Sequence, residues 1–349
     1  MGEVVVLSRE QDDLLSGFLE GDRRATVYHT PEWRDAVAGT YGYRPFYLAY
    51  LDGGRMKAML PLMLVRSWLT GTRLVSLPFS NICGPAGDAG LYGALLEKAL
   101  EIRGRTGARA LEIRTQSDLA AIEDERFSRV SYFITSIMDL HPDPDELWKR
   151  IKDGSVRTEV RQAVKKGVEF RLGKGIEDLR AFYHLFAVNR LRHGVPVTRF
   201  HFFRNVWNIL GPGKRVLFLA EVEGRPTAGL LALGFNKVMS EAYLGADAGY
   251  LSYRVNQMVI WKGMEWACLN GYEKWDFLRT PKNNQGLRFF KAKWGVTEID
   301  LNYFYYPEIA GTASTVEEST KYRVMTAVLK RSPDFLGRML GRVIYRHLG

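Results

Sequence analysis

The sequence predicts an α/β (α+β) protein with two tandem domains, each a mixed twisted sheet flanked by helices. Two observations support this prediction: the length and composition of the chain, and an internal repeat. The chain has 349 residues, of which 46% are hydrophobic and 25% are charged. Soluble globular domains have similar proportions and about 150 residues each, so we expect two folded domains rather than a disordered or fibrous chain.

The internal repeat begins with a predicted β-hairpin in each half of the chain. Residues 46–60 read FYLAYLDGGRMKAML, and residues 217–230 read LFLAEVEGRPTAGL. In both segments, two apolar runs flank a short turn that contains an acidic residue, glycine and arginine. Short glycine-containing turns between β-prone runs are typical of hairpins.

The same order of elements follows each hairpin. A third β-prone stretch comes first, then apolar residues at helical spacing that stop near a glycine, and then a further strand. The predicted strand, helix and final strand are residues 73–79, 90–105 and 108–114 in the first half, and 237–244, 255–270 and 272–278 in the second. Two β-β-β-α-β units indicate a duplicated domain.

The segment between the two units is predicted to be helical over residues 143–169. It begins with prolines and acidic residues, which suit the positive N-terminal end of a helix. A spacing of four residues places Arg157, Arg161 and Lys165 on one helix face, where arginine can bind the phosphates of an anionic acceptor. The alternative for this stripe is a solvated helix face. A further helix is expected over residues 176–193.

These patterns divide the chain into three predicted parts. We expect an N-terminal domain over residues 1–142, a C-terminal domain over residues 143–310 that starts with the basic helix, and a basic helical tail over residues 311–349. Apolar residues recur in the tail at spacings of three and four among its basic residues. One interpretation is peripheral contact with an anionic membrane, and the alternative is a terminal helix packed on the core.

Composition excludes several classes of protein. Two cysteines and six histidines without metal-binding spacing predict neither a metal site nor a disulfide framework. No apolar run approaches the roughly 20 residues of a membrane-spanning helix, and no signal pattern is present, so we expect a cytoplasmic protein whose tail could contact the inner face of the membrane. The net charge of +10 also permits a non-catalytic nucleic-acid-binding protein, although no zinc motif or recognition helix supports that alternative.

Several short motifs accompany the predicted elements. They are Pro31-Glu-Trp33, Tyr43-Arg-Pro45, Ser76-Leu-Pro-Phe-Ser80, Gly84-Pro85, Arg157-x-x-x-Arg161-x-Ala163-x-Lys165-Lys-Gly-Val168, Trp275-Asp-Phe-Leu-Arg279 and Gly286-x-x-x-Phe290-Lys-x-x-Trp294-Gly295. The order of hairpin, strand, helix and strand resembles the core of GNAT acyltransferases. With these motifs, a chain of two such units resembles the FemAB family of peptidoglycan interpeptide-bridge aminoacyltransferases and their BioF2-like acetyltransferase relatives. Leu278 and Thr280 depart from the family, which often has Gly and Ser there.

The resemblance implies an N-acyltransferase that moves an aminoacyl or acyl group to an amine of an anionic precursor of the cell-envelope type. Such an enzyme needs a channel for the donor, a proton acceptor and hydrogen-bond donors for the oxyanion. In the GNAT fold the donor lies in a cleft where two neighbouring strands splay apart. Here those strands would be residues 238–244 and 272–278.

Two residues are candidates for catalysis. Asp276 lies on the strand after the second helix, where the resemblance implies a general base or an anchor for the amine; the alternative is an acid paired with a nearby cation. The family's Phe-Lys pair lies by the reactive end of the donor. Lys291 would then stabilise a developing oxyanion, and Phe290 would stack on the terminal adenine of a tRNA. The alternative is a core aromatic beside a solvated lysine.

The predicted substrate-binding residues lie along the expected paths of donor and acceptor. They come from the basic helix, the splayed strand and the helix after it, the closing motif, and a turn of the first unit. They are Arg157, Arg161, Lys165, Tyr243, Arg254, Asn256, Gln257, Arg279, Phe290, Trp294 and Asn81. Core packing is the alternative for Tyr243, and a turn role is the alternative for Asn81.

The sequence argues against CoA as the donor. GNAT enzymes that use acetyl-CoA usually hold its pyrophosphate on a glycine-containing turn at a helix N-terminus. The corresponding residues 251–258 read LSYRVNQM and contain no glycine. We therefore expect aminoacyl-tRNA or a carrier-bound acyl thioester as the donor and no bound cofactor. The alternative is a GNAT-fold enzyme that uses acyl-CoA or acyl-carrier protein on a small amine.

Overall fold

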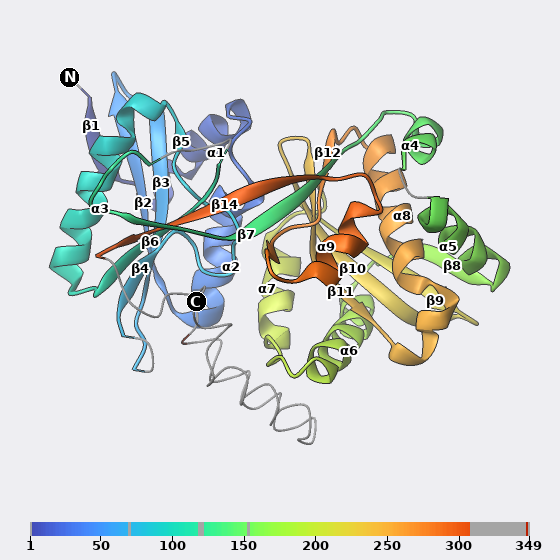
Figure 1. The fold of residues 1–349 in the computed structure, drawn as a ribbon. Helices are drawn as coiled ribbons and strands as arrows, with labels where there is room; N and C mark the ends of the chain where they lie inside the picture. The colour runs from blue at the N-terminus through green and yellow to red at the C-terminus, as the bar shows by residue number, and fades with distance from the viewer. Residues whose placement is uncertain (1, 69–70, 118–121, 152–153, 308–346, 348–349) are drawn as a thin grey trace. The chain divides into compact units, whose positions relative to one another are not determined.

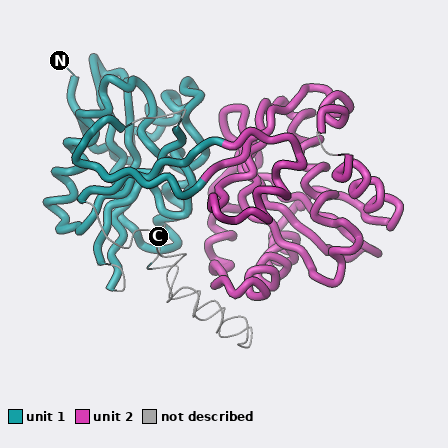
Figure 2. The backbone as a smooth tube through the Cα atoms, in the orientation of Figure 1, with its two compact units in different colours: residues 1–133, 299–319, 343–349 teal, residues 134–298, 320–342 magenta. Residues whose placement is uncertain are grey.

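The computed structural model describes residues 2–68, 71–117, 122–151, 154–307 and 347. The chain divides into two compact units, shown in teal and magenta in Figure 2. Unit 1 comprises residues 1–133, 299–319 and 343–349, and unit 2 comprises residues 134–298 and 320–342. Strands β7 and β14 each carry residues of both units.

Unit 1 is built on a mixed sheet with the strand order β1-β2-β3-β4-β6-β14 (Figure 1). Its strands are β1 (Glu3–Val6), β2 (Arg44–Asp52), β3 (Arg55–Val65), β4 (Arg73–Val75), β5 (Ala86–Gly87), β6 (Ala110–Gln116) and β14 (Thr297–Tyr306). Its helices are α1 (Asp12–Gly21), α2 (Pro31–Tyr41) and α3 (Tyr92–Thr106), with short 3-10 turns at Arg9–Gln11, Val27–His29 and Ala89–Leu91. Strands β2 and β3 are antiparallel, and β4 runs parallel to β6.

Helix α3 packs on the sheet of unit 1 through one apolar face. Leu95, Ala99 and Ile102 are buried and recur at spacings of four and three, which places them on one side of the helix. They share a core with Leu60 of β3 and Leu111 of β6. The burial of this stripe explains why the periodic segment folds as a helix against the sheet.

Unit 2 has the strand order β7-β12-β11-β10-β9-β8. Its strands are β7 (Ser128–Asp139), β8 (Val168–Leu172), β9 (Arg215–Val222), β10 (Arg225–Phe235), β11 (Val238–Ala246), β12 (Lys274–Asp276) and β13 (Thr280–Pro281), which pairs with β7. Its helices are α4 (Pro144–Arg150), α5 (Gly154–Lys165), α6 (Ile176–Arg192), α7 (Phe200–Ile209), α8 (Val255–Leu269) and α9 (Gln285–Ala292), with a 3-10 turn at Ala248–Tyr253.

Helices α6 and α8 cover opposite faces of the sheet in unit 2. Gly263 of α8 lies so close to β12 that a Cβ there would be 2.8 Å from the ring of Trp275. On the other face, a Cβ at Gly229 of β10 would be 2.9 Å from Phe182 of α6. Small residues at these two positions let both helices approach the strands closely.

The structure confirms the predicted repeat of elements. The hairpins are β2–β3 and β9–β10, the following strands are β4 and β11, and the helices are α3 and α8. The strand after each helix runs parallel to the strand before it: β6 to β4 in unit 1, and β12 to β11 in unit 2. The α/β class with mixed sheets and flanking helices is therefore confirmed.

Three predicted elements differ from the structure, and one of them is the strand expected over residues 272–278, of which only residues 274–276 form β12. The helix expected over residues 143–169 is two helices, α4 and α5, and residues 168–169 already belong to strand β8. Gly154, at the start of α5, is a poor residue for a helix interior, and Val168 and Phe170 favour a strand paired with β9. The strand expected over residues 73–79 ends at Val75, because Leu77 and Phe79, with φ values of +45° and +64°, leave the extended conformation.

The predicted amphipathic tail lies almost entirely outside the described residues. Residues 308–346 and 348–349 are outside the described part of the chain. Among the helices that the structure describes, none combines the length and apolar character that crossing a bilayer demands.

Candidate active site

Strands β11 and β12 part in the middle of unit 2. They run parallel over three residue pairs, the last of which joins Ser240 to Asp276. β11 then continues and keeps its pairing with β10. The chain after β12 instead follows β7, where the Phe277 N–H donates a 2.9 Å hydrogen bond to the Ser136 carbonyl. The structure thus shows the strand separation that the sequence predicted at these two strands.

A β-bulge in β11 follows directly after the last pair with β12. Between Ser240 and Tyr243, the two residues Glu241 and Ala242 lie opposite the single residue Ala232 of β10. A bulge leaves an extra residue unpaired in the ladder, changes the direction of a side chain, and is frequent beside active sites. The bulge therefore sets the direction of the Glu241 side chain at the point where the strands part.

Glu241 is a candidate that the sequence analysis did not identify. Its Oε2 atom is buried and has no hydrogen-bond partner among the described residues. Burial raises the pKa of the carboxyl to about 7, while the charge of Lys291 and the indole of Trp275 oppose this rise and the charge of Asp276 adds to it. A carboxyl with a pKa near neutrality is suited to accept a proton. The one signal in the sequence was an acid within an otherwise apolar strand.

Asp276 is buried at the end of β12, with 5% of its surface exposed. Its Oδ1 atom accepts hydrogen bonds from the Thr135 hydroxyl and from the Leu278 N–H, the second at 2.8 Å. Burial raises the pKa of Asp276, whereas these hydrogen bonds and the charge of Lys291 lower it. Its predicted role as a base or an amine anchor stays a prediction.

Lys291 lies on the buried face of α9, with 4% of its surface exposed. Its Nζ atom donates to the Phe277 carbonyl at 2.7 Å, the Leu278 carbonyl at 2.9 Å and Thr280 Oγ1 at 2.7 Å. An ammonium has three N–H donors, so all of them are in use. Lys291 can therefore act on a reacting group through its charge but has no free N–H to donate. Its predicted role in stabilising the oxyanion stays a prediction.

Glu241, Asp276 and Lys291 form one electrostatic cluster in unit 2. Burial lowers the pKa of Lys291 to about 8, and the charges of Glu241 and Asp276 act in the opposite direction. Two acids and one lysine in a buried place shift one another's protonation, which is characteristic of functional sites. The cluster can hold a proton, release it and stabilise a developing negative charge.

Leu278 adopts an unusual backbone conformation between Asp276 and Lys291. Its φ is +58°, in the left-handed region that favours glycine. This is one of the two positions where the chain departs from the FemAB pattern. Arg279, a predicted substrate-binding residue, follows it and is half-buried.

Three other predicted residues pack within unit 2. Phe290 contributes to the hydrophobic core, while its neighbour Phe289 is 67% exposed. Trp294 is fully buried, and its indole N–H has no partner among the described residues. Tyr243 meets the ring of Phe203 edge-on at 5.0 Å. These positions favour packing roles for Phe290 and Tyr243, which was the alternative considered for both.

The start of α8 is tied to α5 rather than open. Arg254 precedes α8 with a φ of +63°, and its guanidinium reaches Gln162 at 3.5 Å and Glu159 at 3.7 Å. Asn256 and Gln257 in the first turn are half-buried, and Asn256 Oδ1 has no partner within the described part of the chain. Side chains thus surround the helix end that carries a glycine turn in CoA-dependent enzymes.

The predicted basic stripe lies on the solvent side of α5. Val156, Val160 and Ala163 form the buried face of this helix. Arg157 is half-buried, whereas Arg161 and Lys165 are exposed. Within the described residues, none of these three cations forms an ion pair, and the Arg161 guanidinium lies 5.8 Å from the centre of the Trp148 ring. The stripe is therefore available to an anionic ligand.

Unit 1 repeats the strand separation with different chemistry. The last parallel pair of β4 and β6 ends at Glu112, the position that matches Asp276. Arg114 Nε donates a 2.8 Å hydrogen bond to Glu112, and another Arg114 nitrogen donates at 2.8 Å to the Ser80 carbonyl. The acid of unit 1 is thus ion-paired. The predicted residue Asn81 also lies in unit 1, and its carbonyl accepts a hydrogen bond from the Tyr303 hydroxyl.

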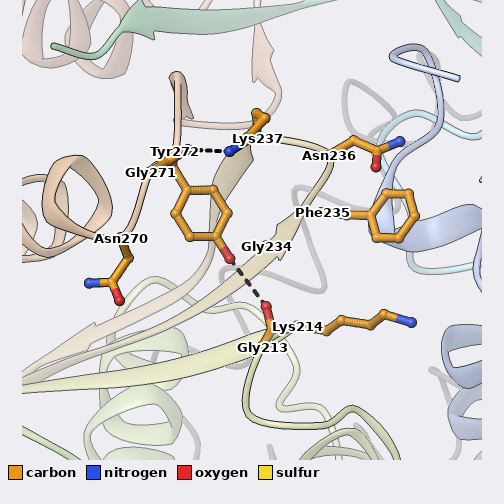
Figure 3. A pocket seen from close by; sticks show the side chains of 9 residues that line it. All are labelled: Gly213, Lys214, Gly234, Phe235, Asn236, Lys237, Asn270, Gly271 and Tyr272. Atoms are coloured by element: carbon orange, nitrogen blue, oxygen red, sulfur yellow. Dashed lines mark hydrogen bonds between the residues drawn. The ribbon is translucent and has the colours of Figure 1, made fainter. Parts of the chain in front are cut away.

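A pocket of about 390 Å³ lies at the turn between β10 and β11 (Figure 3). Residues 213–214, 234–237 and 270–272 line it. Figure 3 shows two hydrogen bonds in its wall, from Lys237 Nζ to the Gly271 carbonyl and from the Tyr272 hydroxyl to the Gly213 carbonyl, both 3.1 Å. The pocket contains neither Glu241 nor any predicted site residue. Among the described residues, no group of three or more His, Cys, Asp or Glu side chains is placed to hold a metal ion.

Comparisons with known proteins agree with this architecture. Residues 152–291 match the family model described as an acetyltransferase (GNAT) domain. The chain is similar to the crystal structure of FemX, with a TM-score of 0.71 and 15% identity over 91% of this chain and 100% of that one. No curated protein matches the sequence.

Two further solved structures share the fold. The C-terminal domain of a protein assigned as a lysylphosphatidylglycerol synthetase from Agrobacterium fabrum matches with a TM-score of 0.60 and 15% identity, over 92% of this chain and 96% of that one. A tandem GNAT protein from the clavulanic acid biosynthesis pathway matches with a TM-score of 0.54 and 13% identity, over 89% and 100%. The chain thus shares the fold of FemX and of the tandem GNAT protein, and its residues 152–291 match a GNAT acetyltransferase domain.

Proposed function

We propose that this protein is an N-acyltransferase that moves an aminoacyl group from an activated donor to an amine of an anionic cell-envelope precursor, such as one of peptidoglycan. The observation that carries this proposal is the Glu241 carboxyl, whose Oε2 atom is buried at the point where β11 and β12 part. An amine must lose a proton when it attacks an activated carbonyl, and Glu241 would accept that proton. Its pKa of about 7 suits a base that works near neutral pH.

The balance of the reaction is simple. The amine nitrogen forms a bond to the acyl carbon, the bond from that carbon to the leaving oxygen or sulfur breaks, and the amine proton passes to Glu241. The positive charge of Lys291 would stabilise the tetrahedral oxyanion over a short distance in a buried place. Protonated Glu241 can then return its proton to the leaving group.

Aminoacyl-tRNA is the donor that the proposal favours over CoA. The side chains of Arg254 and its α5 partners occupy the helix end where CoA-dependent enzymes keep a glycine turn. The name of the similar Agrobacterium fabrum protein, lysylphosphatidylglycerol synthetase, denotes an enzyme whose product is lysine joined to a phosphate-bearing lipid. Arg157 and Arg161, which form no ion pair within the described residues, would bind the phosphates of the acceptor here.

A transfer assay with the full chain tests the proposal. Radiolabelled aminoacyl-tRNA, acetyl-CoA and acyl-carrier protein are each supplied with a uridine-linked muropeptide, and product formation is followed. We expect product with aminoacyl-tRNA, and Glu241→Gln should reduce kcat by about 10²-fold or more, as for the loss of a general base. Glu265→Gln is the matched control, because Glu265 forms a surface ion pair with Lys262 on α8.

Each other result contradicts part of this proposal. If transfer from acetyl-CoA or acyl-carrier protein is faster than from aminoacyl-tRNA, then that molecule, and not aminoacyl-tRNA, is the donor. No transfer from any donor would reject the proposed function. A Glu241→Gln variant as active as the Glu265→Gln control would remove Glu241 as the base.

A further inference from the structure

We propose that Asp276 and Lys291 act together as a clamp that fixes the turn at residues 277–280 and so keeps β11 and β12 apart beside Glu241. This inference rests on the proposed transferase function and deepens it, because it assigns both residues to positioning rather than to the transfer of protons. It follows from the hydrogen bonds around Leu278, from the conformation of that residue, and from the path of the chain after β12.

The clamp holds the backbone of Leu278 from both sides. Asp276 Oδ1 accepts the Leu278 N–H at 2.8 Å, and Lys291 Nζ donates to the Leu278 carbonyl at 2.9 Å. Both side chains are more than nine-tenths buried. Hydrogen bonds to charged groups in a buried place are stronger than those between neutral groups, so the two contacts fix the peptide groups on both sides of the Leu278 Cα firmly.

Other contacts anchor the clamp itself. The Thr135 hydroxyl donates to the same oxygen of Asp276 that accepts the Leu278 N–H. Lys291 also donates to the Phe277 carbonyl and to Thr280 Oγ1. All three donors of Lys291 are therefore directed at the turn, which is what a positioning residue requires.

Leu278 needs such a clamp because its conformation is unfavourable. With a φ of +58° it lies in the left-handed region, which a bulky side chain disfavours by roughly tenfold or more in population. Strained residues of this kind persist only where the surroundings hold them, and they cluster at functional sites. A glycine would adopt the same conformation without this penalty.

The strained turn also explains why the two strands part. Phe277 follows β7 through its hydrogen bond to the Ser136 carbonyl, and the left-handed Leu278 then bends the chain away from β11. An extended Leu278 would let β12 continue beside β11 past Ser240, where Glu241 lies. The clamp thus preserves access to Glu241.

A rescue experiment distinguishes positioning from chemistry. Lys291→Met should lower kcat by about 10²-fold, the usual cost of a misplaced site. Adding Leu278→Gly should then recover about tenfold of that loss, because glycine takes the left-handed conformation unaided. Leu278→Ala is the matched control, since it removes the same side chain but keeps the Cβ that makes this conformation unfavourable. Each double variant is compared with its own Leu278 single variant.

The result that would overturn the clamp is equally specific. If Leu278→Gly and Leu278→Ala leave the Lys291→Met loss unchanged, Lys291 does not act through the backbone of Leu278, and the clamp is rejected. A second pair of variants tests the other half: Asp276→Asn, whose amide oxygen can still accept both hydrogen bonds, should lose about tenfold less activity than Asp276→Ala. Equal losses would show that the carboxylate itself reacts.

Amide exchange gives a readout that does not depend on activity. The Leu278 N–H should exchange slowly in the unmodified protein and in Asp276→Asn, and about tenfold or more faster in Asp276→Ala and in Lys291→Met. Fast exchange in the unmodified protein would reject the clamp. Slow exchange in a protein without transferase activity would reject the proposed function and leave the clamp standing.

Discussion

Thr280 Oγ1 accepts a 2.7 Å hydrogen bond from Lys291 Nζ, and neither side chain has more than 4% of its surface exposed. Thr280 comes four residues after Asp276 on the chain that leaves β12, whereas Lys291 lies on α9. The bond therefore ties α9 to the turn where the two strands part. A hydroxyl at this position supports the charged form of the lysine directly.

Removing this hydroxyl should narrow the pH range of activity. In Thr280→Val the charged form of Lys291 loses one hydrogen bond, so the pKa of Lys291, about 8 in the unmodified protein, should fall by about one unit. The decline of kcat at alkaline pH should then begin about one unit lower. Thr280→Ser keeps a hydroxyl and should retain the original profile. A profile in Thr280→Val that matches the unmodified protein would show that charged Lys291 is not required.

The unmodified protein should show a bell-shaped dependence of kcat on pH. A raised carboxyl pKa means that Glu241 is protonated below about pH 7, so activity should rise as the pH passes through 7. Lys291 loses its proton above about pH 8, so activity should fall there. Because the charge of Asp276 raises the pKa of Glu241, Asp276→Asn should move the rising limb to lower pH. A flat profile between pH 6 and 9 would count against this assignment.

Much of the fold was predictable because it follows local rules that repeat. The hairpins β2–β3 and β9–β10 follow from turn residues between β-prone runs. Helices α3 and α8 follow from apolar spacing that ends near a glycine. The break between α4 and α5 was missed, although Gly154 at the start of α5 is a poor residue for a helix interior.

The candidate site was less accessible to sequence reasoning. Motifs led to Asp276 and Lys291, and in the structure the charges of both residues act on the pKa of Glu241. Glu241 carries no motif, since its role depends on a bulge and on burial that only the pairing of β10 with β11 creates. The left-handed conformation of Leu278 was also hidden, because leucine gives no signal for a turn that tertiary contacts impose.

The buried ion pair of unit 1 should be costly to break. Glu112→Gln leaves the Arg114 guanidinium buried without its close acid, and we expect a loss of about 3 kcal/mol in the free energy of unfolding. The double variant Glu112→Gln with Arg114→Met removes the charge as well and should recover much of that loss. Denaturant unfolding measures both. A double variant no more stable than Glu112→Gln would show that packing, not charge, determines the cost.

The acid sensitivity of unit 1 should depend on His29. Its ring is buried, Nδ1 accepts the Thr26 N–H and Nε2 faces the Gly84 carbonyl, so the neutral form fits the site. Burial lowers the pKa to about 4, whereas the unfolded chain protonates near 6.5. The unfolded state therefore binds more protons, and stability should fall by about 3 kcal/mol as the pH drops from 6.5 to 4. His29→Gln should remove this part of the pH dependence, measured by unfolding at each pH; an unchanged slope would exclude His29 as its source.

The basic stripe on α5 should act on acceptor binding alone. Arg157 is half-buried and has no ion-pair partner within the described residues, so Arg157→Ala removes a charge without breaking an ion pair. We expect the KM for the muropeptide acceptor to rise about tenfold, the cost of lost hydrogen bonds to a charged group, with little change in kcat or melting temperature. The effect should shrink as salt is added, because screening weakens the contact between arginine and phosphate. Arg180→Ala is the matched control, since Arg180 is an exposed arginine of α6 paired with Glu177. If both variants leave the KM unchanged, the stripe is a solvated helix face and the acceptor phosphates bind elsewhere.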